Sequence, residues 1–360
     1  MMQSVSFIIP VYNCKDYLES CVASLMDAVG QKDEILLIDD GSNDGSGALC
    51  DNLAQKYPQI KVLHQRNSGA SAARNRGMDL AKNDFLMFVD ADDSVESARL
   101  AQLLRTLRDG DTYDMVTFGL SFDYYYHGKC YRRDALFAPE DRVMQTEEWG
   151  KELHNLFSAN LISPLWNKVF RRAVIEENHL RLNEALFLYE DLEFVLRFMG
   201  CCGTICNCPD VIYRYRQSED EGNAKRRLKR VTSITELVYY FENPFNSMIE
   251  QKHFGEQTYL DTQQILLELY LMLFREKAAV TKWSELPALS AELAAWAQQI
   301  PNEVIDRLPP GSRQYLDDAV NGRRAKLVLR ERKTRIRHRI AVRVKNTQFY
   351  QKHCRGSHGH

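Results

Sequence analysis

The chain lacks any run of eighteen or more consecutive apolar residues, although 44% of its 360 residues are hydrophobic. A membrane-spanning helix needs about 20 such residues, so we expect none. The first residues, Met1 to Ser6, also lack the basic region and apolar core of a secretory signal peptide. We therefore expect a cytoplasmic protein with an ordinary globular core.

Paired Cys-X-X-Cys motifs are also missing. The nine cysteines, an odd number, are scattered mostly through apolar segments, which indicates reduced buried thiols and not a disulfide framework. Four of them gather between residues 201 and 208, but their spacing is not that of a zinc site. We expect these cysteines to pack in the core.

No Gly-X-Gly-X-X-Gly motif follows the first apolar run, Val5–Ile9, so a dinucleotide-binding domain is disfavoured. Further apolar runs at Glu34–Ile38 and Ile60–His64 alternate with segments of helical periodicity. This alternation with short connections predicts a doubly wound parallel sheet. Asp39 and Asp40 stand at the carboxyl end of the second run, where such sheets bind ligands.

Carboxylates follow another apolar run, Phe85–Val89. If the chain stays extended there, Asp90 and Asp92 lie on one face and Asp93 points the opposite way. Carboxylate oxygens suit Mg²⁺ or Mn²⁺, which complete their coordination with water and substrate phosphates. The residues therefore predict a metal site for a phosphorylated substrate; the alternative is a turn that is acidic only for solubility.

Four ordered motifs resemble those of a known family. They are Pro10–Asn13, Ile38–Ser46, Asn67–Gly77 and Val89–Asp93. In order and spacing they resemble the family 2 glycosyltransferases of GT-A fold, and the chain is similar to bacterial enzymes of capsule, lipopolysaccharide and exopolysaccharide synthesis. The resemblance implies an α/β fold with a mostly parallel, Rossmann-like sheet flanked by helices.

The resemblance and the residue pattern together predict three regions. Residues 1–220 are expected to form the GT-A domain, with a nucleotide-sugar half at about 1–120 and an acceptor half at about 121–220. Beyond it the periodicity becomes all-helical, which predicts a helical domain over 221–321. The remainder, 322–360, is a basic amphipathic tail.

Charge is segregated along the chain, since the tail carries thirteen Lys and Arg residues and one acid, Glu331, while the whole chain has a net charge of −2. Apolar residues recur between the basic ones, approximately as in a helix that lies on anionic lipid. We therefore expect residues 322–345 to contact an anionic membrane surface, with the protein peripheral on the inner face of the cell membrane. A nucleic-acid arm is the alternative. Only Phe349 and Tyr350 are available for stacking, so no nucleic acid is expected.

For the donor, the resemblance implies a nucleobase pocket lined by Pro10, Val11 and Tyr12. Asp40 is expected to accept the uracil ring N–H, with Asp39 as a less certain neighbour. The alternative for Asp40 is an Asx turn.

For the phosphates, the resemblance implies that Arg74 reaches the nucleotide, since a guanidinium donates in bidentate fashion to phosphate. A surface salt bridge is the alternative for Arg74. Asp90 is expected to contact the ribose or the sugar, and Asp92 to hold Mn²⁺ or Mg²⁺ between the two phosphates. Asp93 is a weaker candidate.

For the acceptor, Asp191 of the Glu190–Asp191 pair matches the family's catalytic base. One base on the side opposite the diphosphate implies inversion of the anomeric centre; the alternative is that the pair only complements a helix dipole. Trp166, Asn167 and Lys168 look like the triplet that precedes the base in related enzymes, and with Glu190 they are the acceptor candidates. Core packing is the alternative for Trp166.

One departure from the family concerns the third metal ligand. Many relatives supply a histidine from the loop after the last sheet strand, and Tyr213–Gly222 contains none. Either the diphosphate meets basic and hydroxyl groups directly or a carboxylate replaces the histidine. The first group of candidates is Arg214, Arg216 and Ser218, and the second is Glu219 and Asp220.

The predicted function is a metal-dependent, inverting glycosyltransferase of cell-surface polysaccharide biosynthesis. Its donor is expected to be a nucleoside diphosphate sugar, most simply a UDP-sugar, and its acceptor a saccharide or lipid-linked saccharide. The alternative is a catalytically inactive nucleotide-sugar-binding scaffold at the membrane, which would bind nucleotide without turnover.

Overall fold

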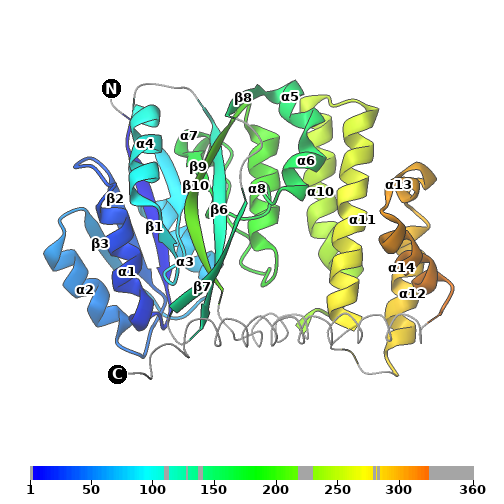
Figure 1. Cartoon of the computed structure of the whole chain (residues 1–360), viewed down its shortest axis with the longest axis horizontal. Helices are drawn as coiled ribbons and strands as arrows, with labels where there is room; N and C mark the ends of the chain where they lie inside the picture. The colour runs from blue at the N-terminus through cyan, green and yellow to red at the C-terminus, as the bar shows by residue number, and fades with distance from the viewer. Residues whose placement is uncertain are drawn as a thin grey trace, which may run out of the picture. The chain divides into compact units, whose positions relative to one another are not determined.

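The computed structural model describes residues 3–108, 113–126, 129–136, 141–217, 230–278, 281 and 284–323. The chain divides into two compact units. Unit 1 comprises Met1–Glu219 with Phe241–Tyr259, and unit 2 comprises Asp220–Tyr240 with Leu260–His360. Among the described residues the strands belong to unit 1, and unit 2 is helical (Figure 1). The domain boundaries at 220 and 321 stay predictions.

One sheet organises unit 1. Its spatial order is β3-β2-β1-β4-β9-β6-β10-β5, with β7 paired to β6 and β8 paired to β10. The described strands are β1 (Val5–Val11), β2 (Glu34–Asp39), β3 (Ile60–His64), β4 (Phe85–Phe88), β5 (Ser94–Val95), β6 (Met115–Tyr126), β7 (Lys129–Leu136), β8 (Arg142–Gln145), β9 (Lys168–Arg171) and β10 (Thr204–Gln217). Strands β1 to β4 are parallel neighbours, and β10 is parallel to β6.

Helices flank this sheet, so the predicted α/β fold is confirmed (Figure 1). The helices that precede β10 are α1 (Lys15–Met26), α2 (Ser46–Lys56), α3 (Ala70–Leu80), α4 (Ser97–Arg108), α5 (Thr146–Lys151), α6 (Leu153–Ser158), α7 (Arg172–Glu177) and α8 (Glu190–Cys201).

Apolar side chains of β1 point alternately to the two faces of the sheet, so both faces must be covered. Phe7 and Ile9 point into the hydrophobic core that α1 and α4 share. Ile8 points the other way and touches α3, where a Cβ on Gly77 would lie 2.3 Å from the Ile8 side chain. Glycine is therefore required at position 77 for α3 to approach the sheet this closely.

Helix α8 packs on the same face of the sheet as α3. The rings of Phe88 on β4 and Phe170 on β9 lie 5.9 Å apart, and Phe170 lies 5.0 Å from Phe198 on α8, both in edge-to-face geometry. Such aromatic packing fixes the helix on the sheet. It brings the amino end of α8 close to α3, since Arg74 of α3 contacts Asp191 of α8.

The helices beyond β10 include α10 (Ile234–Lys252), α11 (Glu256–Ala278), α12 (Leu286–Ala297), α13 (Asn302–Arg307) and α14 (Pro310–Val320). The rings of Tyr270 and Trp296 stack at 4.5 Å in the core of unit 2. No helix among the described residues is long and apolar enough to cross a membrane.

Candidate functional site

The acidic residues after β4 form a tight turn. The Asp93 N–H donates to the Asp90 carbonyl oxygen over 3.1 Å, so Asp90–Asp93 is a β-turn and not the extended segment that the sequence predicted. The chain must turn here because β5 leaves the line of β4 to pair with β10. Asp92 is exposed and Asp93 is buried, so these two neighbours differ as expected, whereas Asp90, expected on the same face as Asp92, is held by the buried Arg74.

Asp93 fastens this turn to β10. Its Oδ2 accepts the Tyr213 hydroxyl over 2.7 Å, and its Oδ1 accepts the Arg216 N–H over 2.7 Å. Burial, together with the negative charges of Asp90 and Asp92, raises the pKa of Asp93 well above its usual range. Both of its oxygens have protein partners, so Asp93 does not fit as a metal ligand.

Asp92 is the open carboxylate of the turn. Its side chain is exposed and makes no hydrogen bond or ion pair with the residues that the structure describes. The same residues include no group of three or more His, Cys, Asp and Glu side chains arranged to hold a metal ion. One open carboxylate still fits Mg²⁺ or Mn²⁺ when substrate phosphates and water supply the other oxygens.

Arg74 is buried beneath the turn, with 5% of the residue exposed, so it is not a surface salt bridge. Its Nη2 donates to Asp90 Oδ1 over 2.7 Å, and its Nη1 lies 3.6 Å from Asp191 Oδ1 and 4.0 Å from Glu190 Oε1. Burial disfavours its charge, but the three carboxylates outweigh burial and hold the pKa of Arg74 above its usual range.

Asp191 lies in the first turn of α8. Burial, reinforced by Glu190 and Asp90 and opposed by Arg74, raises the pKa of the Asp191 carboxyl to about 7. Its Oδ1 is enclosed and accepts no hydrogen bond, although 24% of the side chain is exposed. A carboxylate with these properties is suited to take a proton near neutral pH.

The backbone at the start of α8 is held in an uncommon conformation. Tyr189, the residue before Glu190, has a φ of 60°, which few non-glycine residues adopt. Its ring packs edge-to-face on Phe241 at 6.1 Å. Such left-handed residues cluster at functional sites, where the surrounding packing maintains them.

The predicted nucleobase residues meet where β1 and β2 end. Val11 pairs with Asp39, the Asp40 N–H donates to the Val11 carbonyl, and Pro10 precedes them in β1. Tyr12 follows with 49% of the residue exposed, which leaves its ring available for stacking.

Both aspartates of this region have partners within the chain. Asp40 accepts Gln65 Nε2 and the N–H groups of Ser68 and Gly69, each over 2.8 Å. Its carboxylate therefore holds the loop before α3 and retains little capacity for a uracil N–H. Nor does Asp40 form the Asx turn that was the alternative, because its donors lie 25 to 29 residues away.

Asp39 binds the His64 ring through Oδ2 over 2.8 Å and the Ser42 N–H through Oδ1 over 3.1 Å. The hydrogen bonds of the His64 ring to the carboxylates of Asp39 and Asp51 raise the pKa of His64. This pair fixes the ends of β2 and β3 together.

The acceptor candidates divide into buried and accessible residues. Trp166 is 8% exposed, and its ring stacks on Tyr213 at 4.5 Å and on Tyr215 at 5.1 Å, so it packs in the core and offers little surface to a sugar. Asn167 and Lys168 are fully buried, with Lys168 Nζ donating to the Pro164 carbonyl and to Asn167 Oδ1.

Burial lowers the pKa of Lys168 well below its usual range, although Asp191 opposes this. Lys168 therefore belongs to the electrostatic surroundings of Asp191. Glu190 lies beside Arg74, as described above, and is partly accessible.

A small pocket of about 130 Å³ lies beside the acidic turn. Its lining comprises Ser20, Asp92, Asp93, Ser94, Asp123, Tyr125, Arg214 and Arg216. The Arg216 guanidinium rests on the Tyr125 ring at 3.6 Å, and its Nε donates to the Asp92 carbonyl over 3.2 Å. Its two terminal amino groups make no hydrogen bond with the residues described here. Arg214 is instead ion-paired with Glu96.

Ser218, Glu219 and Asp220, the other candidates for the missing histidine, lie outside the described residues. The sequence analysis overlooked Tyr213. A signal for it was present, because Tyr213, Arg214, Tyr215 and Arg216 alternate, which in a strand places both tyrosines on one face and both arginines on the other.

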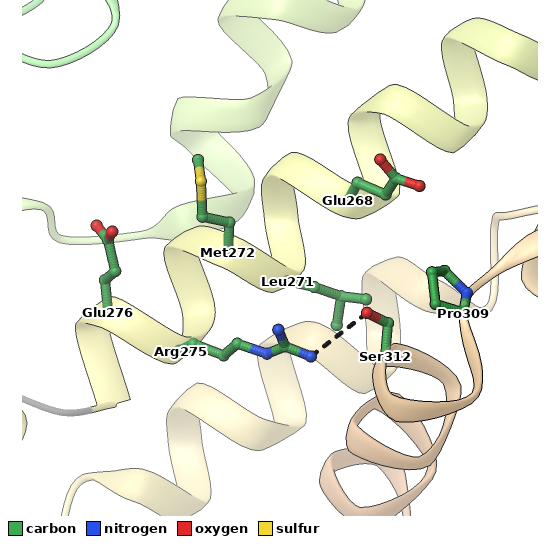
Figure 2. A pocket seen from close by; sticks show the side chains of 7 residues that line it. All are labelled: Glu268, Leu271, Met272, Arg275, Glu276, Pro309 and Ser312. Atoms are coloured by element: carbon green, nitrogen blue, oxygen red, sulfur yellow. Dashed lines mark hydrogen bonds between the residues drawn. The ribbon is translucent and has the colours of Figure 1, made fainter. Parts of the chain in front are cut away.

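Unit 2 has a larger pocket of about 410 Å³ between α11 and the start of α14 (Figure 2). Arg275 lies in it and donates to the Ser312 hydroxyl over 3.5 Å, while its guanidinium covers the Tyr315 ring. The residues that line it include none of the predicted site residues, so the candidate site is the one in unit 1.

Comparison with known proteins agrees with this location. The profile of the family described as Glycosyl transferase family 2 matches residues 6–177. The putative glycosyltransferase EpsH of Bacillus subtilis is 30% identical over 59% of this chain and 60% of its own length. The uncharacterized glycosyltransferase EpsJ of the same organism is 30% identical over 66% of this chain and 65% of its own. The chain thus spans less than two thirds of either relative.

Among solved structures, residues 1–349 of TarS from S. aureus, in complex with UDP-GlcNAc, superpose with a TM-score of 0.67. The match covers 93% of this chain and 92% of that one at 19% identity. At this identity the likeness establishes the fold, and TarS shares the GT-A fold expected from the sequence.

Proposed function

Because the chain belongs to the family 2 glycosyltransferases through residues 6–177, we propose that it transfers a sugar from a nucleoside diphosphate sugar to a saccharide or lipid-linked saccharide. The observation that carries the proposal is the bridge made by Arg74. This buried guanidinium contacts Asp90 of the acidic turn at 2.7 Å and lies 3.6 Å from Asp191. One side chain thereby links the proposed phosphate side of the site to the proposed base.

Asp191 acts as the general base in this proposal. It takes the proton of an acceptor hydroxyl, whose oxygen forms a bond to the anomeric carbon as the bond from that carbon to the diphosphate breaks. The electron pair of the broken bond leaves with the nucleoside diphosphate. A single displacement with one base and no enzyme nucleophile inverts the anomeric centre.

The departing diphosphate needs positive charge near it. Arg74 supplies a buried guanidinium, and Arg216 supplies two amino groups beside the pocket that Asp92 also lines. Asp92 would hold Mn²⁺ or Mg²⁺, which when bound offers Lewis-acid stabilisation of the phosphates. Asp90, held by Arg74, is proposed to meet the ribose or the sugar.

The donor base is proposed to stack on the exposed ring of Tyr12, with Pro10 and Val11 forming the wall beneath it. We propose a UDP-sugar as the donor, which is the class bound in the TarS crystal structure. Asp39 and Asp40 support this pocket by holding the surrounding loops, since their oxygens already have protein partners.

The acceptor is proposed to approach over Glu190 and the accessible part of Asp191, because Trp166, Asn167 and Lys168 are buried. A role in cell-surface polysaccharide synthesis and attachment to the inner face of the membrane remain part of the proposal. Of the tail predicted to contact lipid, residues 324–345 lie outside the described residues.

Thermal unfolding of the wild type and Asp92→Ala, with UDP, GDP, CDP or TDP and with or without Mn²⁺, tests the proposal. A nucleotide at a hundred times its Kd adds about 2.7 kcal/mol to the free energy of unfolding. We expect UDP to stabilise the wild type most strongly with Mn²⁺, and Asp92→Ala to lose the metal-dependent part.

Asp27→Ala is the matched control, because Asp27 is an exposed aspartate at the end of α1, away from the pocket. It should respond to nucleotide as the wild type does. If no nucleotide shifts the transition, the proposal fails. Stabilisation by UDP without transfer from any UDP-sugar would instead favour a nucleotide-sugar-binding scaffold.

A further inference from the structure

Tyr213 lies at the point where β10 crosses the acidic turn. It pairs with Val95 of β5, directly after the turn, and its residue is fully buried. Its ring stacks on Trp166 at 4.5 Å with an interplanar angle of 19°. The ring is therefore fixed by packing, and so is the place of its hydroxyl.

The hydroxyl joins the two ends of the turn. It accepts the Asp90 N–H over 3.0 Å and donates to Asp93 Oδ2 over 2.7 Å. The other Asp93 oxygen accepts the Arg216 N–H over 2.7 Å. A single strand thus holds the first and the last residue of the turn.

The turn needs such support because it carries three carboxylates in four residues. Like charges at this spacing repel one another, and repulsion favours an open loop. Only one backbone hydrogen bond, from the Asp93 N–H to the Asp90 carbonyl, closes the turn from within. Neither glycine nor proline is present between Asp90 and Asp93 to restrict its conformation.

These contacts hold the two ends of the turn and leave Asp92 exposed between them. Arg74 holds Asp90, and Tyr213 and Arg216 hold Asp93, so Asp92 is the one carboxylate of the turn without a hydrogen bond or ion pair to the described residues, and it lines the pocket. Groups that orient a ligand in this way, without touching the ion or substrate, commonly change affinity about 10- to 100-fold when removed.

We propose that Tyr213 is a positioning residue whose hydroxyl, acting through Asp93 and the Asp90 N–H, sets the acidic turn so that Asp92 can receive the donor diphosphate with its cation. The effect on donor binding rests on the proposed function. The effect on the turn itself does not.

Tyr213→Phe tests the proposal, because it keeps the ring and its stack on Trp166 and removes only the hydroxyl. Amide hydrogen exchange of the peptide around residues 88–95, measured without ligand, should become at least about tenfold faster. The Kd of UDP in the presence of Mn²⁺ should rise about tenfold, and the KM for the donor should rise more than kcat falls.

Tyr270→Phe is the matched control from unit 2. Tyr270 is also fully buried and stacks on a tryptophan at 4.5 Å, but its hydroxyl pairs with that of Thr235 at 2.8 Å. The variant should lose a similar amount of thermal stability and leave both the exchange near residues 88–95 and the UDP affinity unchanged.

Asp93→Asn provides a second check, since it removes one partner of the same hydroxyl. Combined with Tyr213→Phe it should weaken UDP binding by less than the product of the two single effects. Unchanged exchange in Tyr213→Phe, or equal losses of UDP affinity in Tyr213→Phe and Tyr270→Phe, would overturn the proposal. Faster exchange in a protein whose wild type binds no nucleotide would refute the proposed function and retain the positioning of the turn.

Discussion

Unit 1 and unit 2 both bury charged residues, but they arrange them differently. In unit 2 the carboxylates of Asp261 and Asp318 each have an arginine, with Arg307 3.1 Å from Asp261 and Arg323 3.5 Å from Asp318. In unit 1 the single guanidinium of Arg74 faces Asp90, Glu190 and Asp191. Arg307 and Arg323 each contact one further carboxylate, Glu303 and Asp317, but these are exposed, so unit 2 buries one carboxylate per arginine. Unit 1 places three partly buried carboxylates around one guanidinium and so leaves negative charge in excess.

The excess of buried negative charge in unit 1 identifies the residues suited to proton transfer or cation binding. Burying a charge costs free energy, and a one-to-one pair with good geometry offsets that cost locally. A cluster that buries more carboxylates than guanidinium groups favours the binding of a proton or a cation. Burial, with the charges of Glu190 and Asp90, raises the pKa of Asp191 to about 7, so this carboxyl can bind that proton near neutral pH. Strongly perturbed carboxylates in an accessible cleft are candidates for function.

Removing one carboxylate from each unit tests most directly whether the two charge clusters differ in function. Asp191→Asn should lower the rate of sugar transfer about 10³-fold, because general base catalysis contributes about 10²- to 10⁴-fold. Asp261→Asn should leave the rate unchanged and lower the melting temperature. The measurement is UDP release coupled to product analysis. Equal rates for the wild type and Asp191→Asn would remove Asp191 from the chemistry.

The next largest effect is expected from the two arginines. Arg74→Met should lower the free energy of unfolding by about 3 kcal/mol, because it leaves three carboxylates without their common partner. Arg307→Met, at a partly exposed pair, should cost less than about 1 kcal/mol. Urea unfolding at pH 8 measures both. The Arg74→Met loss should shrink as the pH falls and the carboxylates gain protons; a loss independent of pH would contradict the cluster.

The pH dependence of activity and of stability should also distinguish the Arg74 cluster of unit 1 from the arginine–carboxylate contacts of unit 2. With the pKa of Asp191 near 7, the value of kcat/KM should rise about tenfold per pH unit below 7 and then level off. Stability should move the opposite way. The folded state retains a proton that the unfolded chain has already lost, so this contribution to stability declines as the pH rises from the ordinary aspartate range to about 7. Asp191→Asn should abolish that decline, and Asp261→Asn should not.

The smallest effect concerns Lys168. Because Lys168 is buried near Asp191, Lys168→Met should move the acid limb of the rate profile to higher pH if the amine carries a charge. Lys277→Met is the control in unit 2, where Nζ donates to the Val231 carbonyl over 2.6 Å. An unmoved profile in Lys168→Met would mean that Lys168 is neutral in the folded protein. Arg74 would then be the one positive charge that opposes the negative charge of this cluster.

Proline normally ends a helix, so Pro244 can be taken for a boundary, yet it lies within α10, which continues to Lys252. Local propensity is a weak signal, and packing of the helix overrides it here.

The parallel strands and the carboxylates at their ends can be predicted from the sequence alone. Apolar runs followed by Asp39, Asp40, Asp90 and Asp92 suffice for that inference, because parallel strands end at one edge of a sheet. The roles of these residues depend on contacts that form only in the folded protein. Asp93 could be a metal ligand or a residue that holds the turn in place, and which of these it is depends on Tyr213, 120 residues further along the chain. Whether Trp166 meets a sugar or the core depends on the two tyrosines of β10. Such contacts follow from the order of strands in the sheet, which sets β10 across the turn after β4, and periodicity within a segment carries no information about that order.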